Sequence, residues 1–165
     1  MTDSRTIENE RMIIGWREWV TLPGLNVPAI KAKIDTGALT SALHAFDMKV
    51  FEVEGIQKIR FRIYPLQRKR KVVLECVGDI KGKKMITDSG GHQELRYVIH
   101  NPIKLGHIQW PIEITLTDRD TMRFRMLLGR SALCGRFLVD PERSYVTGRS
   151  LARYYSRKNR EGSKK

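Results

Sequence analysis

The residues best suited to chemistry in this chain are Asp35, Thr36 and Gly37, which directly follow the alternating segment KAKI. A carboxylate can activate water when a second carboxylate shares its proton, because repulsion between the two leaves one acid and one base. Such a site also needs a small hydroxyl residue and a glycine that lets backbone approach the reacting groups. Alone, the tripeptide is more typical of an ordinary turn, since Asp and Gly are both turn formers.

A second segment favours the catalytic interpretation. MLLGRSAL, residues 126–133, places two apolar residues before a glycine, an arginine and a short helical pattern. In order and separation, this segment and KAKIDTGALTSAL resemble the two landmarks of retropepsins, the small viral-type aspartic proteases. With LTDRDTMRFRMLLGRSAL and FLVDPERSY, they resemble a bacterial branch known as ATP-dependent zinc proteases, often found with ATP-grasp glutamate ligases that modify a ribosomal protein. The resemblance covers residues 13–148.

The resemblance implies an all-β, retropepsin-like (acid protease) barrel with one or two short helices, and Asp35 as the one catalytic aspartate per chain. Thr36 would lock two active-site loops together, Gly37 would keep backbone close to substrate, and Arg130 would brace the loop. The full set of implied supporting residues is Thr36, Gly37, Ala38, Leu128, Gly129 and Arg130. Viral retropepsins pair that arginine with an aspartate where this chain has Leu39, so the partner of Arg130 stays open.

A second catalytic aspartate is not evident within the chain. Asp88-Ser89-Gly90 resembles the second motif of two-lobed pepsins, but it follows Lys81 to Lys84, which we interpret as a polar turn, and no second Gly-Arg segment accompanies it. A two-lobed enzyme would also need a much longer chain. We interpret residues 78–96 as a hairpin that closes over substrate as a flap. The site must then be completed by a second copy in a symmetric homodimer.

The elements that would position Asp35 are short strands at close spacing, which is typical of an all-β barrel or sandwich. Alternation is clearest in KIRFRIYPL and WPIEITLTD. Only SALCGRF and LARYYSRKNR have helical patterns. We predict a flexible N-terminus over residues 1–11, one domain over 12–148, and a basic tail over 149–165. The strands are expected at 12–22, 27–35, 38–45, 47–55, 58–66, 71–80, 95–106, 110–118 and 122–129.

The charge of the chain indicates an acidic partner. With 31 Lys and Arg against 18 Asp and Glu, the net charge is +13, which favours acidic protein, ribosome or nucleic acid as a partner. The basic stretch comprises Lys58, Arg60, Arg62 and residues 68–71. No signal peptide and no apolar run of about 20 residues is evident. Cys76 and Cys134 lie among apolar neighbours, which predicts buried free thiols in a cytoplasmic protein without membrane association.

No metal or cofactor is expected, despite the zinc and ATP in the family's usual description. The sequence contains no H-E-x-x-H, no C-x-x-C and no phosphate-binding P-loop. The histidines His44, His92, His100 and His107 form no local ligand pair. Asp118, Asp120 and Asp140 are interpreted as turn residues, and Trp16, Trp19 and Trp110 as core or interface residues.

Two functions follow. The first is an aspartic endopeptidase, active as a homodimer through Asp35 and acting on acidic or ribosome-associated protein, in association with a ribosome or a glutamate ligase. The second is a non-catalytic module of the same fold, which binds RNA, a ribosome or a ligase through its basic face. Catalysis requires Asp35 and a dimer, whereas binding through charge requires neither.

Overall fold

The strand order returns to its starting strand, so most of the sheet closes into a barrel. This computed structural model describes residues 11–119 and 123–156. In one sheet the order is β2-β3-β10-β4-β9-β8-β7-β6-β5, and β2 also pairs with β8 through Thr21 and Lys104. The strands are β1 (Met12–Gly15), β2 (Arg17–Leu22), β3 (Val27–Ile34), β4 (Ser41–His44), β5 (Phe46–Val53), β6 (Ile56–Ile63), β7 (Leu74–Thr87), β8 (Gln93–Leu105), β9 (Ile108–Thr117), β10 (Met126–Leu128) and β11 (Phe137–Asp140). The short helices are η1 (Pro23–Leu25), α2 (Arg130–Leu133) and η2 (Ser150–Arg153).

The barrel closes around apolar side chains contributed by alternate positions of its strands. Ile30, Leu43, Ile99 and Ile114 are fully buried and come from β3, β4, β8 and β9. Because side chains of a strand alternate between its two faces, the period-two pattern in the sequence fixes which residues enter the core. The all-β barrel with few short helices is therefore confirmed.

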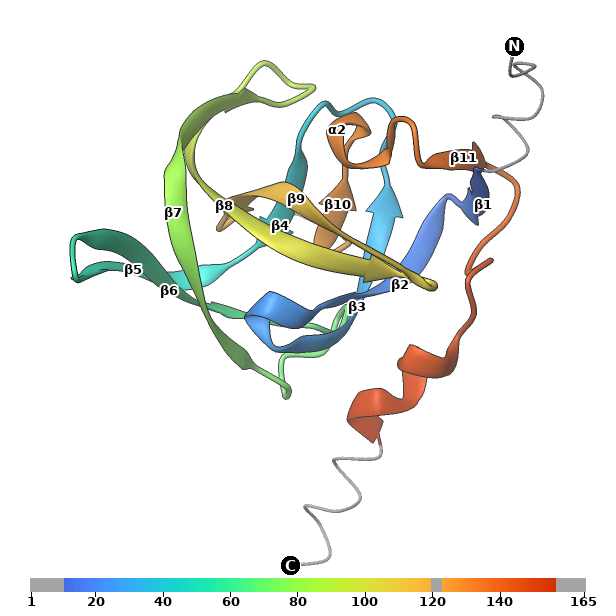
Figure 1. Ribbon diagram of the computed structural model, residues 1–165, viewed down its shortest axis with the longest axis horizontal. Coiled ribbons are helices and arrows are strands. Elements are labelled where there is room, and N and C mark those ends of the chain that lie inside the picture. Colours follow the sequence, from blue (N-terminus) through green and yellow to red (C-terminus); the bar gives the residue numbers. More distant parts are fainter. Residues whose placement is uncertain (1–10, 120–122, 157–165) are drawn as a thin grey trace, which may run out of the picture.

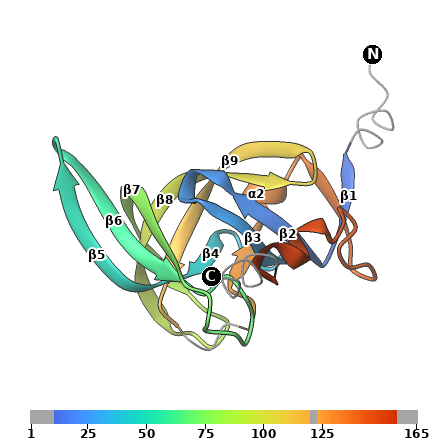
Figure 2. The ribbon, with the colours of Figure 1, turned by 90° about the horizontal axis from the view of Figure 1, so that it is seen from below.

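Strands β5, β6 and part of β7 extend from the barrel as an arm (Figures 1 and 2). The turn between β5 and β6 uses Glu54 and Gly55 at φ values of 52° and 81°, which suits the right-handed twist of a tight hairpin. On the outer face of this arm the cations of β6 are paired with acids. The pairs are Lys58–Asp79 at 2.8 Å, Arg60–Glu75 at 3.3 Å and Arg62–Asp47 at 3.6 Å.

The first and last strands of the described chain, β1 and β11, lie side by side at the edge of the barrel (Figure 1). Strand β1 pairs with β11 in parallel, from Met12 with Phe137 to Gly15 with Asp140. Beyond β11, the first part of the expected basic tail packs on the outside of β3. The Tyr155 side chain is buried there, and its hydroxyl donates to the Ala29 carbonyl.

Three local expectations are wrong. Lys81 to Lys84 are not a polar turn, because they lie within the long strand β7 and pair with β8. Cys134 is exposed, although Cys76 is buried as expected, and burial raises the pKa of the Cys76 thiol to about 12. The strand expected over 122–129 is only Met126–Leu128. Asp120 and residues 157–160 of the second helical pattern lie outside the described residues.

Trp19 and Trp110 are buried, as expected, and Trp16 is half-buried. In the described parts of the chain, no helix has the length and apolar character to cross a membrane.

Candidate active site

Asp35 is the first residue after β3, and its backbone is held by the neighbouring strand. Its N–H donates to the Leu128 carbonyl at 2.8 Å, which continues the parallel pairing of β3 with β10 by one residue. The Asp35 carboxylate oxygen Oδ1 accepts the Gly37 N–H at 3.0 Å, and the Ala38 N–H donates to the Asp35 carbonyl at 3.3 Å. The half-buried carboxylate therefore sits at the head of a tight loop whose tip, Thr36 and Gly37, is exposed.

The segment around Gly129 runs directly over this loop. The Arg130 N–H donates to the Ala38 carbonyl at 2.8 Å, and the Ser131 N–H donates to the Leu39 carbonyl at 3.0 Å. Arg130 Nη1 donates to the Thr36 carbonyl at 2.9 Å. The Thr36 carbonyl is therefore the partner of Arg130 that the sequence left open. It accepts a hydrogen bond from Arg130 although this chain has Leu39 where viral retropepsins have an aspartate. Helix α2 begins at Arg130 beside the loop between β3 and β4, as Figure 1 shows.

Close approach explains the glycine of the second segment. A Cβ atom on Gly129 would lie 2.6 Å from both the carbonyl carbon and the oxygen of Thr40. The φ of Gly129 is −88°, a value open to any residue. Space, and not backbone conformation, therefore requires glycine here. At Gly37 a Cβ would lie 3.2 Å from Asp35 Oδ1, so this glycine leaves room beside the carboxylate.

Two buried hydroxyl residues complete the support, and neither is among the site residues expected from the sequence. Ser41 Oγ accepts the Gly129 N–H at 3.1 Å, and the Thr115 hydroxyl donates to the Ser41 carbonyl at 2.9 Å. Both residues are fully buried. A signal was present, because a serine within the apolar run of β4 and a threonine within that of β9 each need a hydrogen-bond partner when buried.

Asp88 is placed in a different role. It lies at the tip of the hairpin between β7 and β8, where Oδ1 accepts the N–H groups of Gly90 at 2.9 Å and His92 at 2.8 Å. Its other oxygen accepts Arg119 Nη1, and this bond, with the backbone bond from His92, lowers the pKa of Asp88 to about 2. The hairpin expected over 78–96 is present, and Asp88 is its turn residue.

The histidines do not form a metal site. His100 contacts Glu113, His92 contacts Asp88, and His44 is buried beside the Tyr64 ring. Among residues 11–119 and 123–156, no three His, Cys, Asp or Glu side chains are grouped closely enough to hold a metal ion. The donor set therefore does not fit the zinc in the family's usual description.

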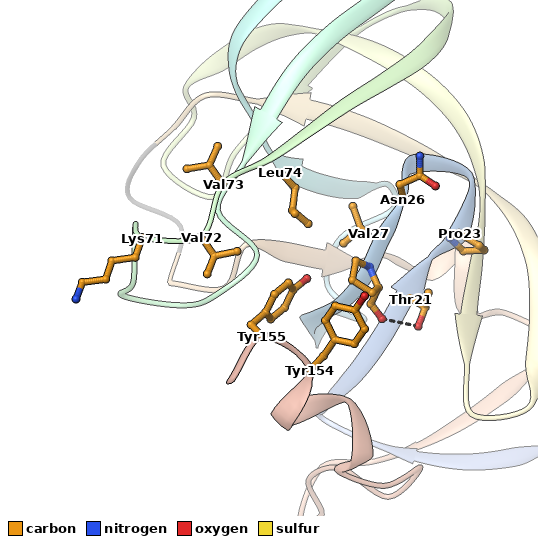
Figure 3. Close-up of a pocket in the computed structure, with 11 residues that line it drawn as sticks. Thr21, Pro23, Asn26, Val27, Lys71, Val72, Val73, Leu74, Tyr154 and Tyr155 are labelled. Atoms are coloured by element: carbon orange, nitrogen blue, oxygen red, sulfur yellow. Dashed lines mark hydrogen bonds between the residues drawn. The ribbon is translucent and has the colours of Figure 1, made fainter. Parts of the chain in front are cut away.

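A cavity of about 590 Å³ lies elsewhere, between η1, the segment before β7 and the two tyrosines that follow η2 (Figure 3). It is bounded by Tyr154 and Tyr155 on one side and by Val27 and Leu74 on another. None of its lining residues belongs to the Asp35 loop or to the Gly129 segment. It is separate from the candidate active site.

A barrel that presents an Asp-Thr-Gly loop, held by a Leu-Gly-Arg segment at the start of a short helix, defines the retropepsin-like class of aspartic endopeptidases. Comparison with family models gives the same class and a narrower assignment. Residues 13–150 match the model described as the retropepsin-like aspartic endopeptidase RimB, and the chain belongs to this RimB-like family.

Curated relatives carry a different name. The chain is 47% identical over 138 residues to a probable alpha-L-glutamate ligase of Parasynechococcus marenigrum, a match covering 84% of this chain and 30% of the relative. A probable alpha-L-glutamate ligase of Shewanella pealeana is 44% identical over 142 residues, covering 86% of this chain and 31% of the relative. The chain thus spans less than a third of the length of these relatives.

A solved structure has a similar fold. It is the crystal structure of Lpg0085 from Legionella pneumophila, described as a protein of unknown function. The TM-score is 0.71 at 31% identity, and the match covers 82% of this chain and 98% of the other.

Proposed function

We propose that this chain is one protomer of a homodimeric aspartic endopeptidase in which Asp35 is the catalytic residue. The observation that carries the proposal is the Asp35 loop itself. The Asp35 backbone N–H donates to the Leu128 carbonyl, the Asp35 carboxylate accepts the Gly37 N–H, and the Gly129 segment holds the loop from behind. A rigid backbone supported by buried hydrogen bonds is what a positioned catalytic carboxylate requires.

Catalysis would use the carboxylates of Asp35 and the partner's Asp35 together. The ionised carboxylate takes a proton from a water molecule while the water oxygen attacks the scissile carbonyl carbon. The protonated carboxyl group donates its proton to the carbonyl oxygen. Collapse of the tetrahedral intermediate breaks the C–N bond, and the amine leaves with a proton from the pair. Exposed Thr36 would contact the partner's loop, and the hairpin of β7 and β8 would close over the substrate as a flap.

The proposed substrate is an acidic protein in the cytoplasm, either ribosome-associated or modified by a glutamate ligase. The net charge of +13 and the names of the curated relatives support this substrate class. We also propose that the endopeptidase acts in association with such a ligase. The binding-module alternative is less well supported, because three of its cations, those of β6, are paired with Asp79, Glu75 and Asp47.

Replacement of the catalytic carboxylate tests the proposal. Asp35→Asn keeps an acceptor for the Gly37 N–H but removes the shared proton, so cleavage of an acidic, unstructured protein should fall at least about 1,000-fold. The matched control is Asp47→Asn, which removes an exposed carboxylate on the arm and should cleave normally. Equal cleavage by Asp35→Asn and the wild type would refute the proposal.

A further inference from the structure

A second cavity, of about 260 Å³, lies on the face of the barrel that carries Lys33. Its lining residues are Trp16, Lys33, Arg123, Phe124 and Leu127. Cavities for drug-sized ligands begin at about 300 Å³, so this one suits a single side chain. The rings of Trp16 and Phe124 meet edge to face at 5.9 Å, and with Leu127 they give it apolar walls.

The cavity lies beside the candidate catalytic residue. Strand residues two apart project from the same face, and the hydrogen bond from Asp35 to Leu128 extends the strand geometry of β3 as far as Asp35. Lys33 and Asp35 therefore project from one face. Leu127 pairs with Lys33 across β3 and β10. The cavity therefore lies beside β3 two residues before the proposed catalytic Asp35. A substrate chain passing Asp35 would lay a side chain near it.

The charge of the cavity is unbalanced. Lys33 and Arg123 are both exposed cations, and none of the described residues that line the cavity is a carboxylate. Within the described residues neither of them forms an ion pair, whereas Lys58, Arg60 and Arg62 on the arm each have an acidic partner. Two unpaired cations over aromatic walls favour a ligand that brings its own carboxylate on an aliphatic stem.

We propose that this cavity is the subsite for an acidic side chain, glutamate before aspartate, on the substrate residue next to the scissile bond. Lys33 is its specificity-determining residue, with Arg123 as a second cation. The aliphatic part of the glutamate side chain packs on Trp16 and Phe124, and its carboxylate reaches the Lys33 ammonium group. The inference rests on the proposed function and deepens it, because it names the residues that select the substrate.

The test compares oligo(Glu-Ala) and oligo(Gln-Ala) peptides as substrates of the full chain. The wild type should prefer the glutamate peptide by about 10- to 100-fold in kcat/KM, the range expected when one charged contact decides between substrates. Lys33→Met should remove most of this preference, because kcat/KM should fall further for the glutamate peptide than for the glutamine peptide. The matched control is Lys49→Met on β5, which lowers the net charge equally at an exposed site on the arm and should keep the preference.

A binding measurement separates failure of this inference from failure of the proposed function. In the Asp35→Asn background, the affinity for oligo(Glu-Ala) should fall about 10-fold with Lys33→Met but not with Lys49→Met. If the wild type cleaves neither peptide but this difference in affinity is found, the catalytic proposal fails and the subsite stands. If the wild type cleaves both peptides equally, or if Lys33→Met and Lys49→Met behave alike, the subsite assignment is wrong.

Discussion

Asp35 and Asp88 make the same local bond, yet the structure gives them different surroundings. Each begins an Asp-x-Gly turn, and each accepts the glycine N–H two residues later, at 3.0 Å for Asp35 and 2.9 Å for Asp88. The difference lies in distant contacts. Arg119 occupies the second oxygen of Asp88, whereas Asp35 is backed by the Leu128 carbonyl and forms no ion pair in the described residues. The local sequence therefore cannot distinguish the role of Asp35 from that of Asp88, but the presence of the distant Gly129 segment beside the Asp35 loop can.

Glu18 is the residue whose loss should cost the most stability. Its carboxylate is fully buried and accepts the N–H groups of Gly15 at 2.7 Å, Val146 at 3.0 Å and Thr147 at 3.0 Å, together with the Thr147 hydroxyl at 2.9 Å. Glu18→Ala leaves these buried donors unsatisfied, each at about 1–3 kcal/mol. We expect the free energy of unfolding to fall by at least about 3 kcal/mol, measured by urea denaturation.

Two further variants control this prediction. Glu18→Gln keeps one acceptor oxygen and should lose less stability than Glu18→Ala. Glu52→Ala, at an exposed glutamate on β5, should change the unfolding free energy by less than about 0.5 kcal/mol. If Glu18→Ala were as stable as Glu52→Ala, the buried carboxylate would not be holding the C-terminal segment to β2.

At the scale of elements, the hairpin of β7 and β8 should be sensitive to acid at its tip. The Arg119 bond holds the pKa of Asp88 at about 2, below the value of about 3.9 expected in the unfolded chain. A group whose pKa is lowered on folding stabilises the fold above its unfolded pKa and loses that contribution as the pH falls through the folded value. The contribution of Asp88 should thus be complete above about pH 4 and fade towards pH 2.

Asp88→Asn tests this prediction directly. The amide still accepts the N–H groups of Gly90 and His92 but cannot balance the Arg119 charge. Amide hydrogen exchange at the hairpin tip should then be faster than in the wild type at pH 5, and the two proteins should converge towards pH 2. Exchange rates in the wild type are corrected for intrinsic exchange. If the corrected rates at the hairpin tip do not change between pH 5 and pH 2, the prediction is contradicted.

The elements were predictable where one face of a strand is buried and the other exposed. β6 and the first half of β9 show this alternation, and the expected strands at 58–66 and 110–118 overlap both. Lys81 to Lys84 in β7 resemble a turn in the sequence because none of them is apolar, and only their pairing with β8 identifies the strand. The pairing of β1 with β11 joins residues at opposite ends of the domain and leaves no local pattern. The Asp35 loop could be predicted from two motifs, but burial of Ser41 and Thr115, and so their supporting role, depends on how the strands pack and could not be read from the sequence.

At the scale of the whole molecule, the proposed carboxylate pair needs two barrels, because each barrel contributes one Asp35 loop. The parallel sheet of β1 and β11 offers a surface for this contact. Ile13 and Leu138 are paired across it and are 47% and 40% exposed. Adjacent exposed apolar side chains on strands with free edges favour association with a second copy.

Leu138→Asp should therefore dissociate the proposed dimer and stop the proposed cleavage together. A charge buried in an apolar contact without a partner weakens association strongly, so we expect the dimer dissociation constant to rise at least 100-fold by analytical ultracentrifugation. Val50→Asp, at a side chain on β5 that is also 40% exposed, should leave both dimer and cleavage intact. Asp35→Asn should abolish cleavage while remaining dimeric, which separates loss of assembly from loss of chemistry. A wild-type protein that cleaves as a strict monomer would overturn both the dimer and the shared carboxylate pair, because the described chain offers no other aspartate held as Asp35 is.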